Sequence, residues 1–351
     1  MAAPELTKRN HYIPASIVGA FSDEPKSRMR DSVVYWAMKG WPQPKPSKVE
    51  KLFCLDDIYT LPAMQEPWKV GLLIYMWHVC VGVEKVPPVE LIEEDLIGTL
   101  ALLATGFSKD GELRPDVVEG MLATELDAPF NDVATRLREG LPPSEPDLEL
   151  CRAFLSLLYF RGPAWKHSST CAQMVRHGLA RERARFEASG RFDPASWSDP
   201  VVVAMQEILP EISYMLDLGE RTRKRVNLLT RRHFAIELLR AGPGIGFVIG
   251  DNAARAYSAY EDPSRLTPSA KGIRNPGVVI VFPIGQKHAL RVVQRDNGPR
   301  FQRLDVSDVE VRGINTAQLT MAAQKVVFPG RLTDVFVHGA SVEASTPWIE
   351  L

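Results

Sequence analysis

Residues 277–285 read GVVIVFPIG, and this stretch decides the fold class. Its run of apolar, largely β-branched residues between two glycines predicts a buried strand. Residues 245–250, IGFVIG, predict a short buried strand before it, and residues 288–296, HALRVVQRD, a third strand after it. A fourth strand is expected between Phe301 and Val311. The late part of the chain is therefore predicted to form a sheet.

The middle of the chain has the spacing of helices. Between about residue 68 and residue 240, apolar residues recur at helical intervals, interrupted by Pro, Gly and Asp. Residues 147–160, DLELCRAFLSLLYF, are apolar nearly all round, which predicts a central helix. A basic helix is expected in residues 220–241, ERTRKRVNLLTRRHFAIELLRA, and a last helix in residues 314–328, INTAQLTMAAQKVVF.

Extended segments are expected near the N-terminus. Asp31–Met38, DSVVYWAM, predicts a strand, because it is rich in β-branched and aromatic residues. The three prolines of residues 39–48, KGWPQPKPSK, forbid a helix and indicate a loop or an edge crossing. Residues 51–62, KLFCLDDIYTLP, predict a second short extended piece.

These elements predict an α+β fold. A helix-rich central bundle would accompany a small mixed or antiparallel sheet, built mainly from the C-terminal strands plus the N-terminal ones. We expect one domain over residues 1–351, with an N-terminal arm and strands at 9–62, a helical region at 68–240, and C-terminal strands and a helix at 245–340.

The composition is ordinary for a soluble protein. Hydrophobic residues make up 45% of the 351 residues, charged residues 24%, and the net charge is −1. The four cysteines lack zinc-type spacing, which favours a reducing cytoplasm without disulfides. The most apolar run, residues 70–83, has 14 residues, fewer than the roughly 20 that span a bilayer. We expect a cytoplasmic protein without membrane contact.

The glycines of residues 241–251, AGPGIGFVIGD, do not form a phosphate loop. A dinucleotide fingerprint requires a strand before the glycines and a helix after them. Here the glycines are expected to follow a helix and precede a strand, as helix C-caps do. The P-loop, GxSxG and HExxH signatures are also absent from the chain.

The charges are unevenly distributed along the chain. Residues 220–240 carry seven Arg or Lys and two Glu, whereas residues 107–150 carry eleven acids and four bases. These faces either are solvated or neutralise one another, or the basic helix binds a phosphate-containing ligand or nucleic acid. No aromatic residues interleave with its arginines, which weakens the case for single-strand binding there.

Two further features concern titratable residues. None of the seven histidines is spaced for metal binding on one helix face, so a metal site would need distant segments. Asp251 and Asn252 directly follow the predicted strand 245–250, where a functional carboxylate or a simple Asx-turn would both be typical.

The order of several short motifs resembles one known family. The motifs are HYIP at 11–14, VVYW at 33–36, DDIYTL at 56–61, FRGPAW at 160–165, GFVIGDNA at 246–253, VVIVFPIG at 278–285 and INTAQ at 314–318. Over roughly residues 9–328 the chain resembles the family catalogued as domain of unknown function 4238, found in bacteria and also in fungi. The resemblance marks, residue by residue, His11, Tyr12, Pro14, Tyr59, Arg161, Pro163, Asp251, Asn252, Phe282, Pro283 and Asn315.

The chain also departs from the family pattern. Gly250 stands where the family has Ser, Ala253 where it has Pro, and Gly162 where it has Thr. Ile17 and Val18 replace the usual Leu-Arg. The His, Arg and Asp of the pattern remain, so altered substrate choice or lost activity are the expected consequences if the family site is catalytic.

The first hypothesis is a hydrolase or transferase acting on a phosphate ester, in a nucleotide or nucleic acid. His11 would be the general base or a metal ligand, and Asp251 would hold a divalent metal or orient His11. Arg161 would clamp a phosphate or carboxylate. Tyr12, Asn252 and Asn315 would bind the substrate, and the two asparagines would donate to a developing anion.

The alternative is a non-catalytic binding or interaction module, for example in a bacterial defence or toxin-related system. His11 would then hydrogen-bond Asp251 as a buried clasp that holds the N-terminal arm on the sheet. The catalytic hypothesis requires His11, Arg161 and Asp251 to meet in an open cleft, whereas the clasp requires His11 and Asp251 to be in direct contact and sealed from water.

Overall fold

The computed structural model describes residues 9–39, 41, 44–56, 108–109, 112–113, 123–161, 234–258, 266–268, 277–295 and 298–329. The elements of the first half, in chain order, are β1 (Arg9–His11), α1 (Ala15–Gly19), η1 (Met29–Asp31), β2 (Val33–Met38), β3 (Lys45–Lys48), η2 (Val49–Lys51), β4 (Cys54–Asp56), β5 (Ser108–Lys109), β6 (Glu112–Leu113), η3 (Ala123–Asp127), α5 (Ala128–Arg138) and α6 (Glu145–Arg161). Those of the second half are β7 (Phe234–Ala241), β8 (Ile249–Gly250), β9 (Ala256–Ser258), β10 (Thr267–Pro268), β11 (Val278–Gly285), β12 (His288–Gln294), β13 (Phe301–Val306), α11 (Asp308–Met321) and β14 (Lys325–Phe328).

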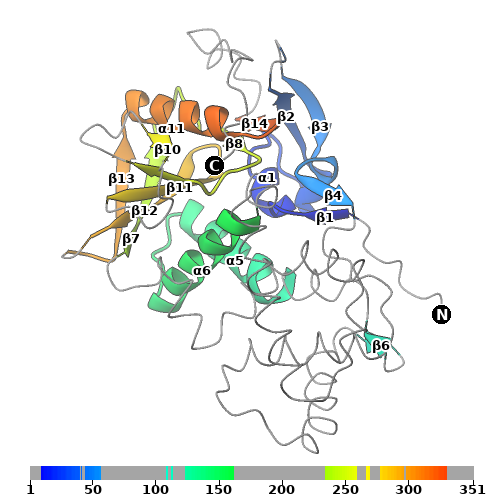
Figure 1. Ribbon diagram of the computed structural model, residues 1–351, viewed down its shortest axis with the longest axis horizontal. Coiled ribbons are helices and arrows are strands. Elements are labelled where there is room, and N and C mark those ends of the chain that lie inside the picture. Colours follow the sequence, from blue (N-terminus) through cyan, green and yellow to red (C-terminus); the bar gives the residue numbers. More distant parts are fainter. Residues whose placement is uncertain are drawn as a thin grey trace, which may run out of the picture.

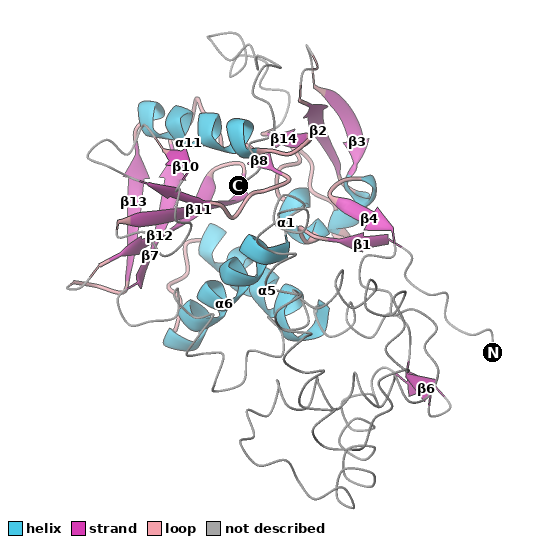
Figure 2. Ribbon diagram, in the orientation of Figure 1, coloured by secondary structure: helices cyan, strands magenta, loops and turns pink. Residues whose placement is uncertain are grey.

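Six of the late strands form a mixed sheet in the order β10-β9-β11-β12-β7-β13. All neighbours pair antiparallel except β13, which runs parallel to β7. The strands predicted from residues 277–285 and 288–296 are β11 and β12, and they lie inside this sheet. The α+β class and the mixed sheet are therefore confirmed (Figure 2).

Helices cover both faces of the six-stranded sheet (Figure 1). On one face, the rings of Phe130 in α5 and Phe154 in α6 stack with 3.6 Å between centroids, and Phe154 meets Phe282 of β11 at 5.9 Å. On the other face, Val311 and Ile314 of α11 pack in a second apolar cluster. The predicted central helix of residues 147–160 is confirmed as part of α6.

The early strands join two late strands in a second, four-stranded sheet. Its order is β3-β2-β14-β8, and every pair is antiparallel. The predicted strand at 31–38 is β2, and the proline-rich stretch supplies the edge strand β3, where Pro46 needs no amide hydrogen. N-terminal strands thus do pair with C-terminal ones, as predicted, but apart from the larger sheet.

One predicted helix is wrong in its last part. Residues 234–241 form strand β7 with burial on both faces, not the end of a basic helix over 220–241, so the helical region cannot extend to residue 240. The apolar run FAIELL suits a central strand flanked on both sides, and a buried strand of this length cannot be told from a helix by periodicity. Residues 220–233, and the apolar run 70–83, lie outside the described residues.

The last predicted helix has different boundaries. Ser307 caps α11 by accepting a hydrogen bond from the amide of Glu310, and the helix begins at Asp308, six residues before the predicted start at 314. It ends at Met321, because Ala322 turns to an extended conformation and Val326 and Val327 pair as β14. The fourth predicted strand likewise stops at Val306.

Candidate functional site

Asp251 lies directly after β8 and is almost completely buried, with 3% of its surface exposed. Its Oδ1 accepts a hydrogen bond from the amide of Ala323 at 2.5 Å, and its Oδ2 accepts from Gln324 at 2.8 Å and Lys325 at 2.9 Å. The Asp251 amide in turn donates to the carbonyl of Lys325 at 3.0 Å. The carboxylate therefore fastens the turn between α11 and β14 to the end of β8.

Asn315 and Gln318 of α11 make comparable bonds to the segment before and after β8. Asn315 accepts from the amide of Val248 at 2.9 Å and donates to the carbonyl of Gly246 at 2.8 Å. Gln318 accepts from the amide of Gly250 at 3.1 Å and donates to the carbonyl of Ala253 at 2.9 Å. Both side chains are buried, and both replace the backbone partners that a longer β8 would have had.

Asn252 completes this fastening. Its buried side-chain amide donates to the carbonyl of Met321 at 3.0 Å, the last residue of α11. The structure thus brings Asp251, Asn252 and Asn315 together, as the sequence hypothesis required, on the line where β8 meets α11. Gln318 was not predicted, although its position three residues after Asn315 on the buried face of the helix was a usable signal.

The departure at Gly250 has a steric reason in this chain. A Cβ placed there would lie 2.9 Å from the carbonyl oxygen of Gln318 and 3.1 Å from the Cβ of Ala322. Helix α11 therefore passes too close to β8 for the serine of the family pattern.

The charge of Asp251 affects Tyr12 of the HYIP segment. Tyr12 is buried, and its amide donates to the carbonyl of Phe53 at 3.0 Å. Burial raises the pKa of Tyr12, and the negative charge of Asp251 raises it further. Burial also raises the pKa of Asp251, while the three amide donors offset part of that shift.

For His11 and Arg161 the structure gives the position in the backbone but fewer side-chain contacts than for Asp251. His11 is the last residue of β1, pairs with Cys54 of β4, and is half-buried. Its contact with Asp251, which the clasp hypothesis requires, stays a prediction. Arg161 is the last residue of α6, but its side chain lies outside the described part of the chain, as do Tyr59 and Pro163.

The glycine-rich loop between β7 and β8 binds the side-chain ammonium group of Lys287. The ammonium of Lys287 donates to the carbonyls of Gly242 at 2.9 Å and Pro243 at 2.8 Å, and also to that of Ile245. A phosphate loop would point amide hydrogens inward instead. The loop follows strand β7 rather than a helix, so the interpretation of its glycines as a helix C-cap was wrong. A phosphate loop is still excluded, because β8 and not a helix follows the glycines.

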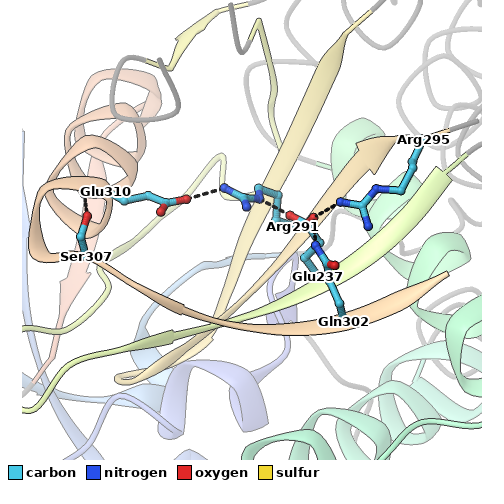
Figure 3. A network of polar contacts seen from close by, with 6 residues as sticks. All are labelled: Glu237, Arg291, Arg295, Gln302, Ser307 and Glu310. Carbon is cyan, nitrogen blue, oxygen red and sulfur yellow. Dashed lines mark hydrogen bonds and ion pairs between the residues drawn. The ribbon is translucent and has the colours of Figure 1, made fainter. Parts of the chain in front are cut away.

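A polar network that the sequence did not predict surrounds Glu237 of β7 (Figure 3). Its carboxylate, 2% exposed, accepts from Arg291 at 2.5 Å, Arg295 at 2.8 Å and Gln302 at 2.5 Å. Arg291 also bonds Glu310 in the first turn of α11 at 2.5 Å. Two arginines balance two glutamates, so the network links three strands and a helix without leaving an unpaired charge.

The described residues show neither a metal-binding cluster nor a membrane-spanning helix. There, no group of three or more His, Cys, Asp or Glu side chains is arranged to hold a metal ion, and the divalent metal stays a prediction. In the same part of the chain, no helix combines the length and apolarity of a membrane span.

Comparison with known proteins identifies the family. The family model described as Protein of unknown function (DUF4238) matches residues 9–330. The chain belongs to this family. Curated proteins and solved structures gave no match. The DUF4238 match covers β1 through β14, so the six-stranded sheet, the four-stranded sheet and the Asp251 turn lie within the family region.

Proposed function

We propose that this DUF4238 chain is a non-catalytic binding module, in which the Asp-Asn motif fastens the fold. One observation carries the proposal: the Asp251 carboxylate is bound by three consecutive backbone amides. A carboxylate has about four acceptor positions, so most of its capacity is used by the protein's own backbone. A general base or metal ligand needs that capacity for the reaction.

The two asparagines support the same function. Asn315 uses both its oxygen and its nitrogen on backbone groups, and Asn252 donates to the end of α11. Neither arrangement leaves these side chains aimed at a ligand. Recurrence of such residues in a family would follow from the fold, because buried backbone groups need partners.

The test compares two Asp→Asn variants by urea unfolding at pH 7. Asp251→Asn turns one acceptor into a donor facing amide hydrogens, and should cost about 2–4 kcal/mol of unfolding free energy. Asp305→Asn is the matched control, since Asp305 is exposed and its side chain bonds only Arg240 among the described residues; this change should leave the free energy of unfolding nearly unaltered. An Asp251→Asn protein as stable as wild type would contradict the proposal.

The phosphoester enzyme remains a second candidate, favoured by one observation. Burial raises the pKa of Tyr12 and the negative charge of Asp251 raises it further, which supports a site shared by these two family motifs. This candidate predicts hydrolysis of bis(p-nitrophenyl) phosphate, with or without added divalent metal, that Tyr12→Phe and Asp251→Asn reduce at least tenfold while both variants stay folded. The binding module predicts no turnover by the wild type.

A further inference from the structure

The β2–β3 hairpin forms the outer edge of the four-stranded sheet (Figure 1). It carries both aromatic rings and lysines. Trp36 of β2 lies directly opposite Lys45 of β3. The ring of Trp41, between the strands, lies 5.0 Å from that of Trp36, and the ammonium of Lys45 lies 4.7 Å from the Trp41 ring centroid. Trp41 nevertheless keeps 37% of its surface exposed. The hairpin thus presents an ordered aromatic surface beside a cation.

The charge around this surface is strongly positive. Residues 26–51 contain seven Lys or Arg and two acids, a balance of +5 in a chain whose net charge is −1. The segments join in space, because Lys48 pairs with Val33 and the amide of Val49 donates to the carbonyl of Ser32. The exposed cations of residues 26–51 are Lys26, Arg28, Arg30, Lys45, Lys48 and Lys51, of which Lys45 and Lys48 lie on opposite faces of β3.

We infer that the β2–β3 hairpin binds single-stranded nucleic acid, which rests on the proposed binding function and names its partner. Single strands offer both phosphates for the lysines and unstacked bases for the indole rings. A duplex hides its base faces, so it would use only the charges. An acidic peptide would likewise engage the lysines and leave Trp41 without a flat partner.

Protection of the sheet edge against pairing with other chains explains only part of the hairpin's residue composition. Lysines and a proline on an edge strand prevent pairing with other chains, and β3 has Lys45, Pro46 and Lys48. That role gives no reason for an exposed indole held between another indole and a lysine. Trp41 therefore separates the two explanations.

The experiment measures fluorescence anisotropy of labelled 15-nucleotide dT and rU strands with the full chain, over a series of salt concentrations. Trp41→Ala should weaken binding about tenfold, and Trp41→Phe should recover most of it. Lys45→Gln with Lys48→Gln should reduce the slope of log K against log salt by about 1.4, since each phosphate contact contributes about 0.7.

Two controls match these changes elsewhere on the surface. Arg303→Gln with Arg312→Gln removes two exposed cations, and Val309→Ala trims a side chain that is 64% exposed. Both should bind as the wild type does. Absence of wild-type binding would overturn the inference, as would equal affinity for duplex DNA or poly-glutamate, or binding that the hairpin variants leave unchanged.

Gel analysis of the same oligonucleotides separates the two proposals. Cleavage by the wild type, with binding still lost in Trp41→Ala, would support the hairpin site and overturn the non-catalytic function. Loss of stability in Asp251→Asn, together with no oligonucleotide binding by the wild type, would support the fastening role and overturn the hairpin site.

Discussion

Three consecutive amides point at one carboxylate in the turn between α11 and β14. Such a concave set of N–H groups is a general anion site, and here Asp251 of the same chain occupies it. The arrangement explains why a buried acidic residue can be tolerated next to Tyr12. It also gives Asp251 a role that depends on residues more than seventy positions later in the chain.

Helix α11 lies so close to Gly250 that it limits the size of any side chain at this position. Gly250→Ser should lower the unfolding free energy by about 1–3 kcal/mol, because the new Cβ meets the Gln318 carbonyl at 2.9 Å and a backbone group cannot easily move. Gly244→Ser is the control, since a Cβ there meets no atom within 4 Å and should change stability by less than about 0.5 kcal/mol. Chemical unfolding of both variants checks this, and equal stabilities would refute the close-approach explanation.

The sequence identified the right neighbours in this part of the molecule but not their chemistry. Asp251, Asn252 and Asn315 were grouped through the family pattern, and the structure does bring them together. Their hydrogen-bond partners are backbone groups. The sequence does not show which backbone groups a side chain will bond, because residues of every type carry them. Gln318 was not predicted for the same reason, because its partners are also backbone groups.

At the scale of elements, Asp147 links the ends of α5 and α6. Its carboxylate bonds Arg136 of α5 through both oxygens, at 2.6 and 3.1 Å, and accepts from the amide of Ser144 at 2.8 Å. The hydrogen bonds from Arg136 are the largest cause that lowers the pKa of Asp147 to about 2. The charged form is therefore stabilised in the folded state.

The low pKa of Asp147 predicts a loss of stability in acid. The contribution is complete above the ordinary pKa of about 4 and disappears as the pH falls toward 2, because the folded state then has to take up the proton. Because solvent screens the exposed Arg136, the wild type should lose about 0.5–1 kcal/mol more than Asp147→Asn between pH 6 and pH 2.5. Urea titrations at several pH values measure this, and parallel curves for the two proteins would contradict it.

Elements whose pattern fits one kind of secondary structure along its whole length were predicted well, whereas segments in which helix and strand meet within an unbroken pattern were not. Residues 278–285, VVIVFPIG, are buried at every position, and α6 buries Leu148, Phe154 and Leu155, so pattern and structure agree. The error at β7 arose because a strand buried on both faces follows a basic stretch without any Gly or Pro between them. Likewise, nothing in INTAQLTMAAQKVVF breaks the helical spacing before β14 pairs with β2.

At the scale of the whole molecule, the six-stranded sheet should be the most stable unit. Strands β11, β12 and β7 lie inside it, between α5 and α6 on one face and α11 on the other, whereas β3 is an edge strand with exposed lysines. Amides of the three inner strands should therefore exchange with D₂O at least a hundredfold more slowly than those of β3. Hydrogen-exchange mass spectrometry of the full chain tests this, and similar rates in β3 and β12 would disprove it.

The four-stranded sheet has a consequence for biosynthesis. Met38 of β2 pairs with Lys325 of β14, so β2 leaves the ribosome long before its central partner exists. At about 5–20 residues per second, translation of the intervening chain takes roughly 15–60 s. During that interval one edge of the nascent hairpin is open and the other carries the lysines and proline of β3, so the four-stranded sheet can close only after β14 has been synthesised.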